Sequence, residues 1–211
     1  FKFKEGLSQV QKPIFTSIIG NINTYTAVVA FYIAVAGTLF ITTPLKKGVL
    51  GKGEGIGKTV FYYIVMFMSF IALAMGNSDN GYLTLAAFFG LMPFVAFRSM
   101  EGVRRYLLTI FSYFLGIKII QLINVAFADK VLGISGLYQF ISNFKYLNLV
   151  VVLLGVITAL MYAVAYMNRG KETDSEALLK ALRYVWIGIL VLGILAVIYI
   201  AMSINSDIDA G

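Results

Sequence analysis

The stretch "TSIIGNINTYTAVVAFYIAVAGTLFI", residues 16–41, joins a polar start to an apolar run that is long enough to cross a bilayer. About 20 apolar residues in a helix span the roughly 30 Å of hydrocarbon, so the run predicts a transmembrane helix. Its start carries side chains that hydrocarbon disfavours, namely Asn21, Asn23, Thr24 and Thr26. Either these residues face a wet outer cavity, or they cap the helix where it meets water.

The composition of the whole chain extends this prediction. Of its 211 residues, 60% are hydrophobic and 13% charged, whereas ordinary soluble domains carry about 25% charged residues. No segment alternates with the period of two that a membrane barrel needs, so we expect an all-α integral membrane protein. The apolar runs predict a bundle of about six transmembrane helices, at residues 22–43, 59–76, 82–97, 106–127, 147–167 and 184–204. The third is short and contains Pro93, which predicts a kink.

The segments outside these spans have distinct characters. Residues 128–146 are too polar to span and rich in aromatic residues, which predicts an outer interfacial or re-entrant segment. Its rings expected at headgroup level are those of Tyr138, Phe140, Phe144 and Tyr146. The stretch "TDSEALLKALR" predicts a helix that begins near residue 174 and continues into the last span. Its signals are a capping box of Thr173 with Glu176 and an i,i+4 pair of Glu176 with Lys180.

The basic residues set the expected orientation. The loops 44–58, 98–105 and 168–183 hold eleven Lys and Arg residues, and the opposite side holds five. By the positive-inside rule, the eleven lie in the cytoplasm and both termini lie outside a plasma membrane. The leading segment 1–21 and the tail 205–211 are then extracytoplasmic. A net charge of +7 split into such short clusters predicts a bilayer as partner and no nucleic acid.

Several kinds of site are excluded or disfavoured. The chain has no cysteine and no histidine, which excludes disulfides and thiolate metal sites and removes the commonest metal ligand, so we expect no metal and no cofactor. "GKT" at 57–59 matches the end of a phosphate-binding loop. However, Lys52 stands where that loop needs glycine, so we interpret this loop as a flexible cationic one.

Lys118 is a candidate because of its expected depth. It lies near the centre of the span 106–127, about 18 Å by helical rise from Tyr106, which is too deep for easy snorkelling. Gln121 and Asn124 follow at three-residue steps and share its helix face. An intramembrane cation indicates function by default, here contact with an anionic lipid-linked group or a solute. The alternative is a structural lysine bonded to carbonyl oxygens or to these two amides.

A second polar cluster, "MGNSDNGYL", separates the second and third expected spans on the outer side. It contains Ser78 and Asp79, and its residue types favour a plain turn for local hydrogen-bonding reasons. The expected topology places this turn and the polar start near residue 21 on one surface. The two could line a single cavity.

At these two segments the sequence resembles the O-antigen ligase and polymerase family of bacterial envelopes. In that family a Gly-Asn-x-Asn element opens an outer helix end, here Gly20 to Asn23, and a Ser-containing turn ends a later span, here Ser78 with Asp79. Many members carry Ser-Arg at that turn, where this chain has Asp79. The family's long outer loop with catalytic basic residues would begin at the tail "NSDIDAG", so the resemblance implies a fragment without the first spans and the main catalytic loop, which we expect to be inactive by itself.

The resemblance implies a metal-independent glycosyltransferase in a bacterial plasma (inner) membrane. It would transfer or polymerise glycan from an undecaprenyl-diphosphate carrier to an acceptor glycan or lipid. Asn21, Asn23, Thr24 and Ser78 are the expected sugar or acceptor contacts, with Gln121 and Asn124 further candidates. Lys118 is a possible diphosphate contact, and Asp79 a possible catalytic base or sugar-orienting group.

Two other classes of protein remain open. One is a six-span solute-binding membrane subunit or small transporter, with Lys118, Gln121 and Asn124 at a midplane site. The other is a structural membrane subunit, whose intramembrane polar groups pair only with one another.

Overall fold

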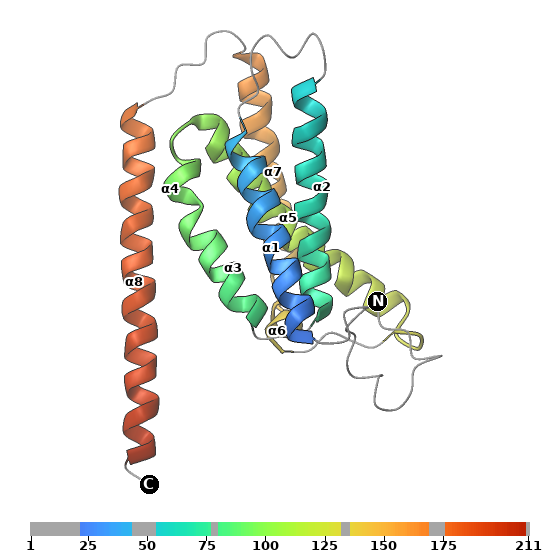
Figure 1. The fold of residues 1–211 in the computed structure, drawn as a ribbon, viewed down its shortest axis with the longest axis vertical. Coiled ribbons are helices and arrows are strands. Elements are labelled where there is room, and N and C mark those ends of the chain that lie inside the picture. Colours follow the sequence, from blue (N-terminus) through green and yellow to red (C-terminus); the bar gives the residue numbers. More distant parts are fainter. Residues whose placement is uncertain (1–21, 44–53, 77–79, 132–135, 169–175, 210–211) are drawn as a thin grey trace.

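The computed structural model describes residues 22–43, 54–76, 80–131, 136–168 and 176–209, and this part of the chain forms eight helices and no strand (Figure 1). The all-α prediction is therefore confirmed. The helices are α1 (Ile22–Thr42), α2 (Glu54–Gly76), α3 (Asn80–Leu91), α4 (Pro93–Ala96), α5 (Met100–Ala126), α6 (Gly136–Ser142), α7 (Leu147–Met167) and α8 (Glu176–Asp209).

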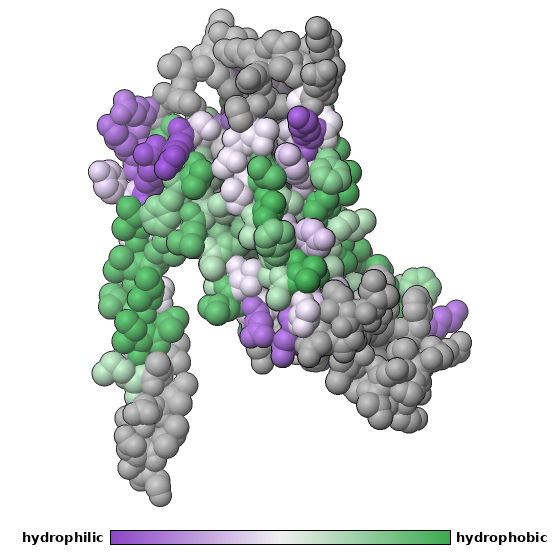
Figure 2. All heavy atoms as spheres, in the orientation of Figure 1, coloured by the Kyte–Doolittle hydropathy of each residue, from purple (hydrophilic) through white to green (hydrophobic). Residues whose placement is uncertain are grey.

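Five of these helices are long and apolar enough to cross a bilayer, as expected for a multi-pass membrane protein. The candidate spans are Asn23–Thr42, Gly55–Gly76, Met100–Ala126, Leu147–Met167 and Glu176–Tyr199. A shorter apolar helix covers Asn80–Ala96. Figure 2 shows hydrophobic residues over the middle of the bundle and of α8, with hydrophilic residues gathered at the upper end of α8. This banding is what a bilayer requires.

The core lies where α1, α2, α3 and α5 meet. Its members are large aliphatic and aromatic side chains with little or no exposure, among them Ile33, Phe40, Met66, Phe70, Leu73, Phe88 and Ile117. Helices α1 and α3 approach closely because Gly37 has no side chain: a Cβ there would lie 2.5 Å from the ring of Phe88. Helix α7 packs on α5, and most of its surface is exposed.

The kink predicted at Pro93 is confirmed, since the helix is interrupted between α3 and α4. Proline has no N–H to donate to the carbonyl of Phe89 one turn earlier. The Tyr106 hydroxyl from α5 donates to that oxygen across 2.7 Å. In the same broken turn, the Trp186 indole from α8 donates to the carbonyl of Gly90 across 2.9 Å. Two other helices thus supply hydrogen bonds to the turn that the proline interrupts.

Two helices begin earlier than predicted. Helix α2 starts at Glu54 instead of 59, so part of the expected cationic loop is helical. Helix α5 starts at Met100 instead of 106, because the Ser99 hydroxyl caps it by accepting from the Gly102 N–H across 3.1 Å. The predicted start of the last helix and its Glu176–Lys180 pair, at 2.7 Å, are confirmed. Thr173, its expected capping partner, lies outside the described residues.

The earlier start of α5 changes the position of Lys118 along its helix. By helical rise, Lys118 lies about 27 Å from the beginning of the helix and only about 12 Å from its end. The prediction counted from Tyr106, which lies almost two turns inside α5, and the depth of Lys118 in a bilayer stays a prediction. Lys118 instead stands near the end of α5 that contacts α6.

The aromatic segment 128–146 contains the short helix α6. Phe140, Phe144 and Tyr146 are exposed there, which is compatible with the headgroup position predicted for them. Tyr138 is different, since it is fully buried with its ring 5.2 Å from that of Tyr82. The prediction of an interfacial ring was wrong for Tyr138, because its side chain faces inward. The Leu137 N–H donates to the Tyr82 hydroxyl across 3.1 Å and holds α6 beside α3.

Candidate functional site

The structure describes five of the eight predicted site residues. Asn21, Ser78 and Asp79 lie outside the described residues. Asn23 and Thr24 occupy the first turn of α1, and both are exposed. Lys118, Gln121 and Asn124 lie in the last third of α5 and are half-buried.

The first group of site residues lies where the beginnings of α1 and α3 meet. The side-chain amide of Asn80 donates to the side-chain oxygen of Asn23 across 3.3 Å. Asn80 belongs to the predicted turn and is the first residue of α3, so the contact joins the polar start of α1 to one residue of that turn. In Figure 1 both helix starts lie at the lower end of the bundle, opposite the upper ends of α4, α5 and α8. These amides can pair with the hydroxyl groups of a sugar.

The polar start of α1 is divided between two environments. Asn23 and Thr24 are exposed, whereas Tyr25 and Thr26 face α2. The Tyr25 hydroxyl donates to the carbonyl of Ala72 across 3.0 Å, and a Cβ at Gly76 would lie 3.0 Å from the Tyr25 ring. Thr26 is buried, and its hydroxyl has no hydrogen-bond partner among the residues that the structure describes. Only the first half of the polar start can therefore contact a ligand from outside.

The second group is a chain of hydrogen bonds between α5 and α6. The Lys118 ammonium donates to the Gln121 side-chain oxygen across 2.6 Å. The Gln121 amide in turn donates to the backbone carbonyl of Ser142, at the end of α6, across 2.5 Å. Asn124, one turn further along α5, does not take part in this chain. The bonds attach α6 to α5 near the end of the bundle where α3 begins.

Hydrogen bonds thus divide the predicted site residues into two groups. Asn23 pairs with α3, and Lys118 and Gln121 pair with each other and with α6. Within the described ranges, no three His, Cys, Asp or Glu side chains form a group that could hold a metal ion. The chemistry that these two groups offer is hydrogen bonding by amides and hydroxyls, with one nearby ammonium.

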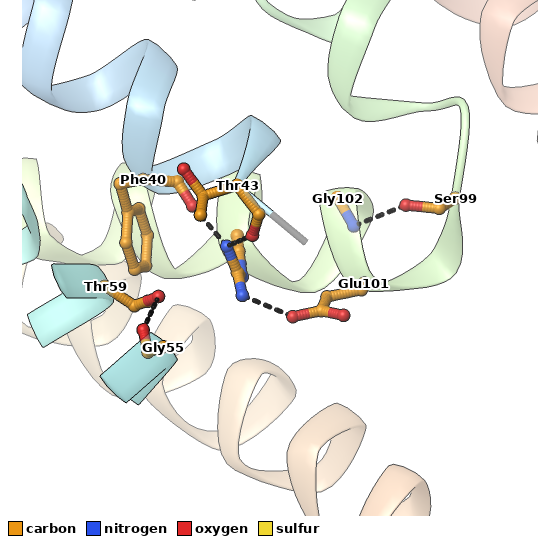
Figure 3. Close-up of polar contacts among 8 residues, drawn as sticks. Phe40, Thr43, Gly55, Thr59, Ser99, Glu101 and Gly102 are labelled. Atoms are coloured by element: carbon orange, nitrogen blue, oxygen red, sulfur yellow. Dashed lines mark hydrogen bonds and ion pairs between the residues drawn. The ribbon is translucent and has the colours of Figure 1, made fainter. Parts of the chain in front are cut away.

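Sequence reasoning missed Arg105, which it counted among the loop cations. Arg105 lies one turn into α5 and is 3% exposed. Its guanidinium donates to the carbonyls of Phe40 and Thr43, at 2.6 Å each, where α1 ends; in Figure 3 it is the unlabelled group from which dashed lines run toward Phe40, Thr43 and Glu101. It also pairs with Glu101 and lies 5.6 Å from the centre of the Phe40 ring. Arg105 therefore satisfies two carbonyls at the end of α1.

A sequence signal for this arrangement did exist. Glu101 and Arg105 stand at i,i+4, the spacing of ion pairs on a helix. The pair indicates that α5 begins before residue 101. The acceptors on α1 are 62 and 65 positions away, however, and no local pattern predicts them.

The chain was also compared with known proteins. A scan against protein-family models and searches of curated proteins and of solved structures found no match for it.

Proposed function

We propose that this chain is the membrane part of a bacterial envelope glycan ligase or polymerase that acts on undecaprenyl-diphosphate-linked glycan at the outer face of the plasma membrane. The proposal includes six spans, with the Asn80–Ala96 helix as the third, and both ends outside. It rests on the resemblance at Gly20–Asn23 and Ser78–Asp79 and on one structural observation. This is the Asn80–Asn23 contact at 3.3 Å, which joins the starts of α1 and α3.

Charge distribution supports the proposed orientation. Of the described basic residues, six lie near the ends of α2, α4, α5 and α8 that form the upper end of the bundle in Figure 1, namely Lys58, Arg98, Arg104, Arg105, Lys180 and Arg183. The other three, Lys118, Lys130 and Lys145, lie toward or beyond the end of α5 and before the start of α7. The Asn23–Asn80 contact lies at the opposite end. If the basic end is cytoplasmic, the paired asparagines lie at the outer face of the plasma membrane, where the proposed enzyme would act on lipid-linked glycan.

The proposed chemistry assigns separate tasks to the two groups. Asn23 and Thr24, with Asn21 and Ser78, would bind hydroxyl groups of the sugar or acceptor, because amides and hydroxyls both donate and accept. Lys118 would stabilise the departing diphosphate, since a cation near developing negative charge lowers the barrier. Asp79 would take the acceptor's proton or orient the sugar.

The test of this proposal is Asn23→Ala in the protein expressed from its own reading frame. We expect loss of polymer or ligation product on an envelope-glycan gel, with unchanged amounts of protein in the membrane. Asn80→Ala should weaken the same product, because it removes the amide that orients Asn23. Asn143→Ala is the matched control, since Asn143 is an exposed asparagine next to α6. Normal product in Asn23→Ala would exclude this residue from the site.

A solute-binding subunit or small transporter is the alternative, and Lys118 is the residue that separates it from the glycan enzyme. A transporter needs Lys118 and Gln121 to bind solute near the midplane. Their bonds to each other and to Ser142, near one end of α5, favour a different role for them. Solute uptake that depends on Lys118 in vesicles, with a normal glycan pattern, would support the transporter.

A further inference from the structure

One face of α8 changes its surroundings along its length. Residues at alternating steps of four and three share this face, namely Leu179, Arg183, Trp186, Leu190, Gly193 and Val197. The first half of the face is docked: Leu179 is buried, and Trp186 bonds to Gly90. The second half is exposed from Gly193 onward. The same face of α8 therefore contacts the bundle in its first half and is left exposed in its second half.

The two helices separate below this docked half. Leu190 is the point of divergence, since a Cβ on Gly90 would lie 3.5 Å from its side chain. Further along, α8 and α3 spread apart in Figure 1, and Figure 2 shows the open wedge between them. A groove of about 430 Å³ lies on this part of α8, lined by Ile189, Leu190, Gly193, Ile194, Val197 and Ile198. These residues are all apolar and all lie on α8, so the groove is an open apolar surface along one helix, from which the removal of water is favourable.

Two arginines, Arg183 and Arg98, lie toward the end of the groove that adjoins the docked half of α8. The Arg183 Nε–H donates to the carbonyl of Phe97 across 2.9 Å, and Arg98 follows Phe97 directly with an exposed side chain. Lys180 is nearby but paired with Glu176 at 2.7 Å. Neither the Nη groups of Arg183 nor the guanidinium of Arg98 bonds to a side chain in the described part of the protein. An apolar groove with two such arginines at one end is complementary to an acidic headgroup on an acyl chain.

We propose that this groove binds an anionic phospholipid, with its phosphate between Arg98 and Arg183 and one acyl chain along α8 from Leu190 to Ile198. The dimensions agree with one leaflet. Arg183 and Ile198 are about 22 Å apart by helical rise, and half of a bilayer including headgroups is about 20–22 Å thick. The headgroup lies at the basic end of the bundle, which is the side that faces anionic lipids if that end is cytoplasmic. The proposal does not depend on the glycan activity.

The single tryptophan of the chain provides the measurement. Trp186 lies between Arg183 and the groove, so a brominated acyl chain in the groove quenches its fluorescence. The intact protein is reconstituted into phosphatidylcholine vesicles with increasing brominated phosphatidylglycerol or, separately, brominated phosphatidylcholine. We expect phosphatidylglycerol to reach half-quenching at a lower mole fraction. Arg98→Gln should raise that mole fraction about fivefold, the usual effect of one cation near an anionic membrane surface.

Matched variants separate the groove from general lipid contact. Gly193→Leu fills the groove and should reduce quenching by both lipids. Gly188→Leu is its control on the opposite face of α8, and a Cβ at either glycine meets nothing within 4 Å, so both positions are open to a side chain. Lys58→Gln removes an exposed cation from the start of α2 and should leave the lipid preference unchanged. The proposal would be overturned if both lipids quenched Trp186 equally and Gly193→Leu left this quenching unchanged. It would also be overturned if a second copy of the chain covered the groove and shielded Trp186 from both brominated lipids.

Discussion

Trp186 donates its indole N–H to the carbonyl oxygen of Gly90 across 2.9 Å, although 96 positions separate the two residues. The acceptor lies in the turn that Pro93 breaks, and the Tyr106 hydroxyl bonds to the neighbouring carbonyl of Phe89. The rings of Trp186 and Tyr106 also meet edge to face, 6.3 Å apart. A single proline thus creates acceptors through which α5 and α8 attach to α3.

A double-mutant cycle tests whether the proline makes the Tyr106 hydroxyl necessary. Tyr106→Phe leaves the Phe89 carbonyl without its donor and should lower the free energy of unfolding in micelles by about 1–3 kcal/mol. In Pro93→Ala, residue 93 regains an N–H that can bond to Phe89, so the further loss from Tyr106→Phe should be much smaller. Equal losses in both backgrounds would show that the hydroxyl acts independently of the break.

Arg105 is expected to be the most sensitive basic residue of the chain. Arg105→Met removes the donor from the carbonyls of Phe40 and Thr43 and leaves Glu101 unpaired, which should cost about 3 kcal/mol or more. Arg105→Lys keeps the charge but loses the planar fork, so it should restore only part of this stability. Arg98→Gln is the exposed control and should change the melting temperature little. The readout is thermal unfolding in detergent, and an unaffected Arg105→Met would contradict the assignment.

Gly102 is required by the tight turn between α4 and α5. A Cβ there would lie 2.1 Å from the backbone oxygen of Ala96, which cannot move without opening the turn. Gly102→Ala should therefore destabilise the protein by at least the roughly 1–3 kcal/mol typical of overpacking. Gly57→Ala, in α2 with nothing near its Cβ, should be neutral or stabilise by about 0.5–1 kcal/mol. Similar melting temperatures for the two variants would argue against this turn geometry.

Gln121 and Lys118 should differ in how strongly they affect α6. Gln121→Leu deprives the Ser142 carbonyl of its donor and should loosen α6, seen as faster hydrogen exchange at residues 136–142. Lys118→Met leaves the Gln121–Ser142 bond in place and should retain the slow exchange. Asn124→Leu, one turn away, is the control. If Lys118→Met accelerates exchange as much as Gln121→Leu, the ammonium itself holds the segment.

The helical elements were largely predictable because their signal is local. The span 147–167 coincides with α7, and the ends of α1, α2 and α5 were predicted within one residue. The largest errors at the beginnings of helices lie at Glu54 and Met100, where polar or charged residues start a helix before its apolar run. At the other end of the chain, α8 continues to Asp209, past the predicted end of the last span at 204. At the beginning of α5, capping by Ser99 decides the boundary instead of hydropathy.

The candidate site was less predictable because burial is decided by partners far along the chain. The sequence predicted Asn23 as a site residue, but not its hydrogen bond with Asn80. It also predicted the Tyr138 ring at headgroup level, whereas the structure buries this ring against Tyr82. The roles of all eight predicted site residues stay predictions, and Asn21, Ser78 and Asp79 also lie outside the described residues.

By itself the sequence determined that this protein is helical and membrane-spanning, because an apolar run in hydrocarbon must hydrogen-bond its own backbone N–H and C=O groups and only a helix does so within one segment. Tertiary structure alone decided which polar groups form hydrogen bonds between helices. Arg105 closes the end of α1, and Trp186 and Tyr106 bond to the turn broken by Pro93. Each of these bonds joins residues from different helices, and their approach depends on packing that no local spacing encodes.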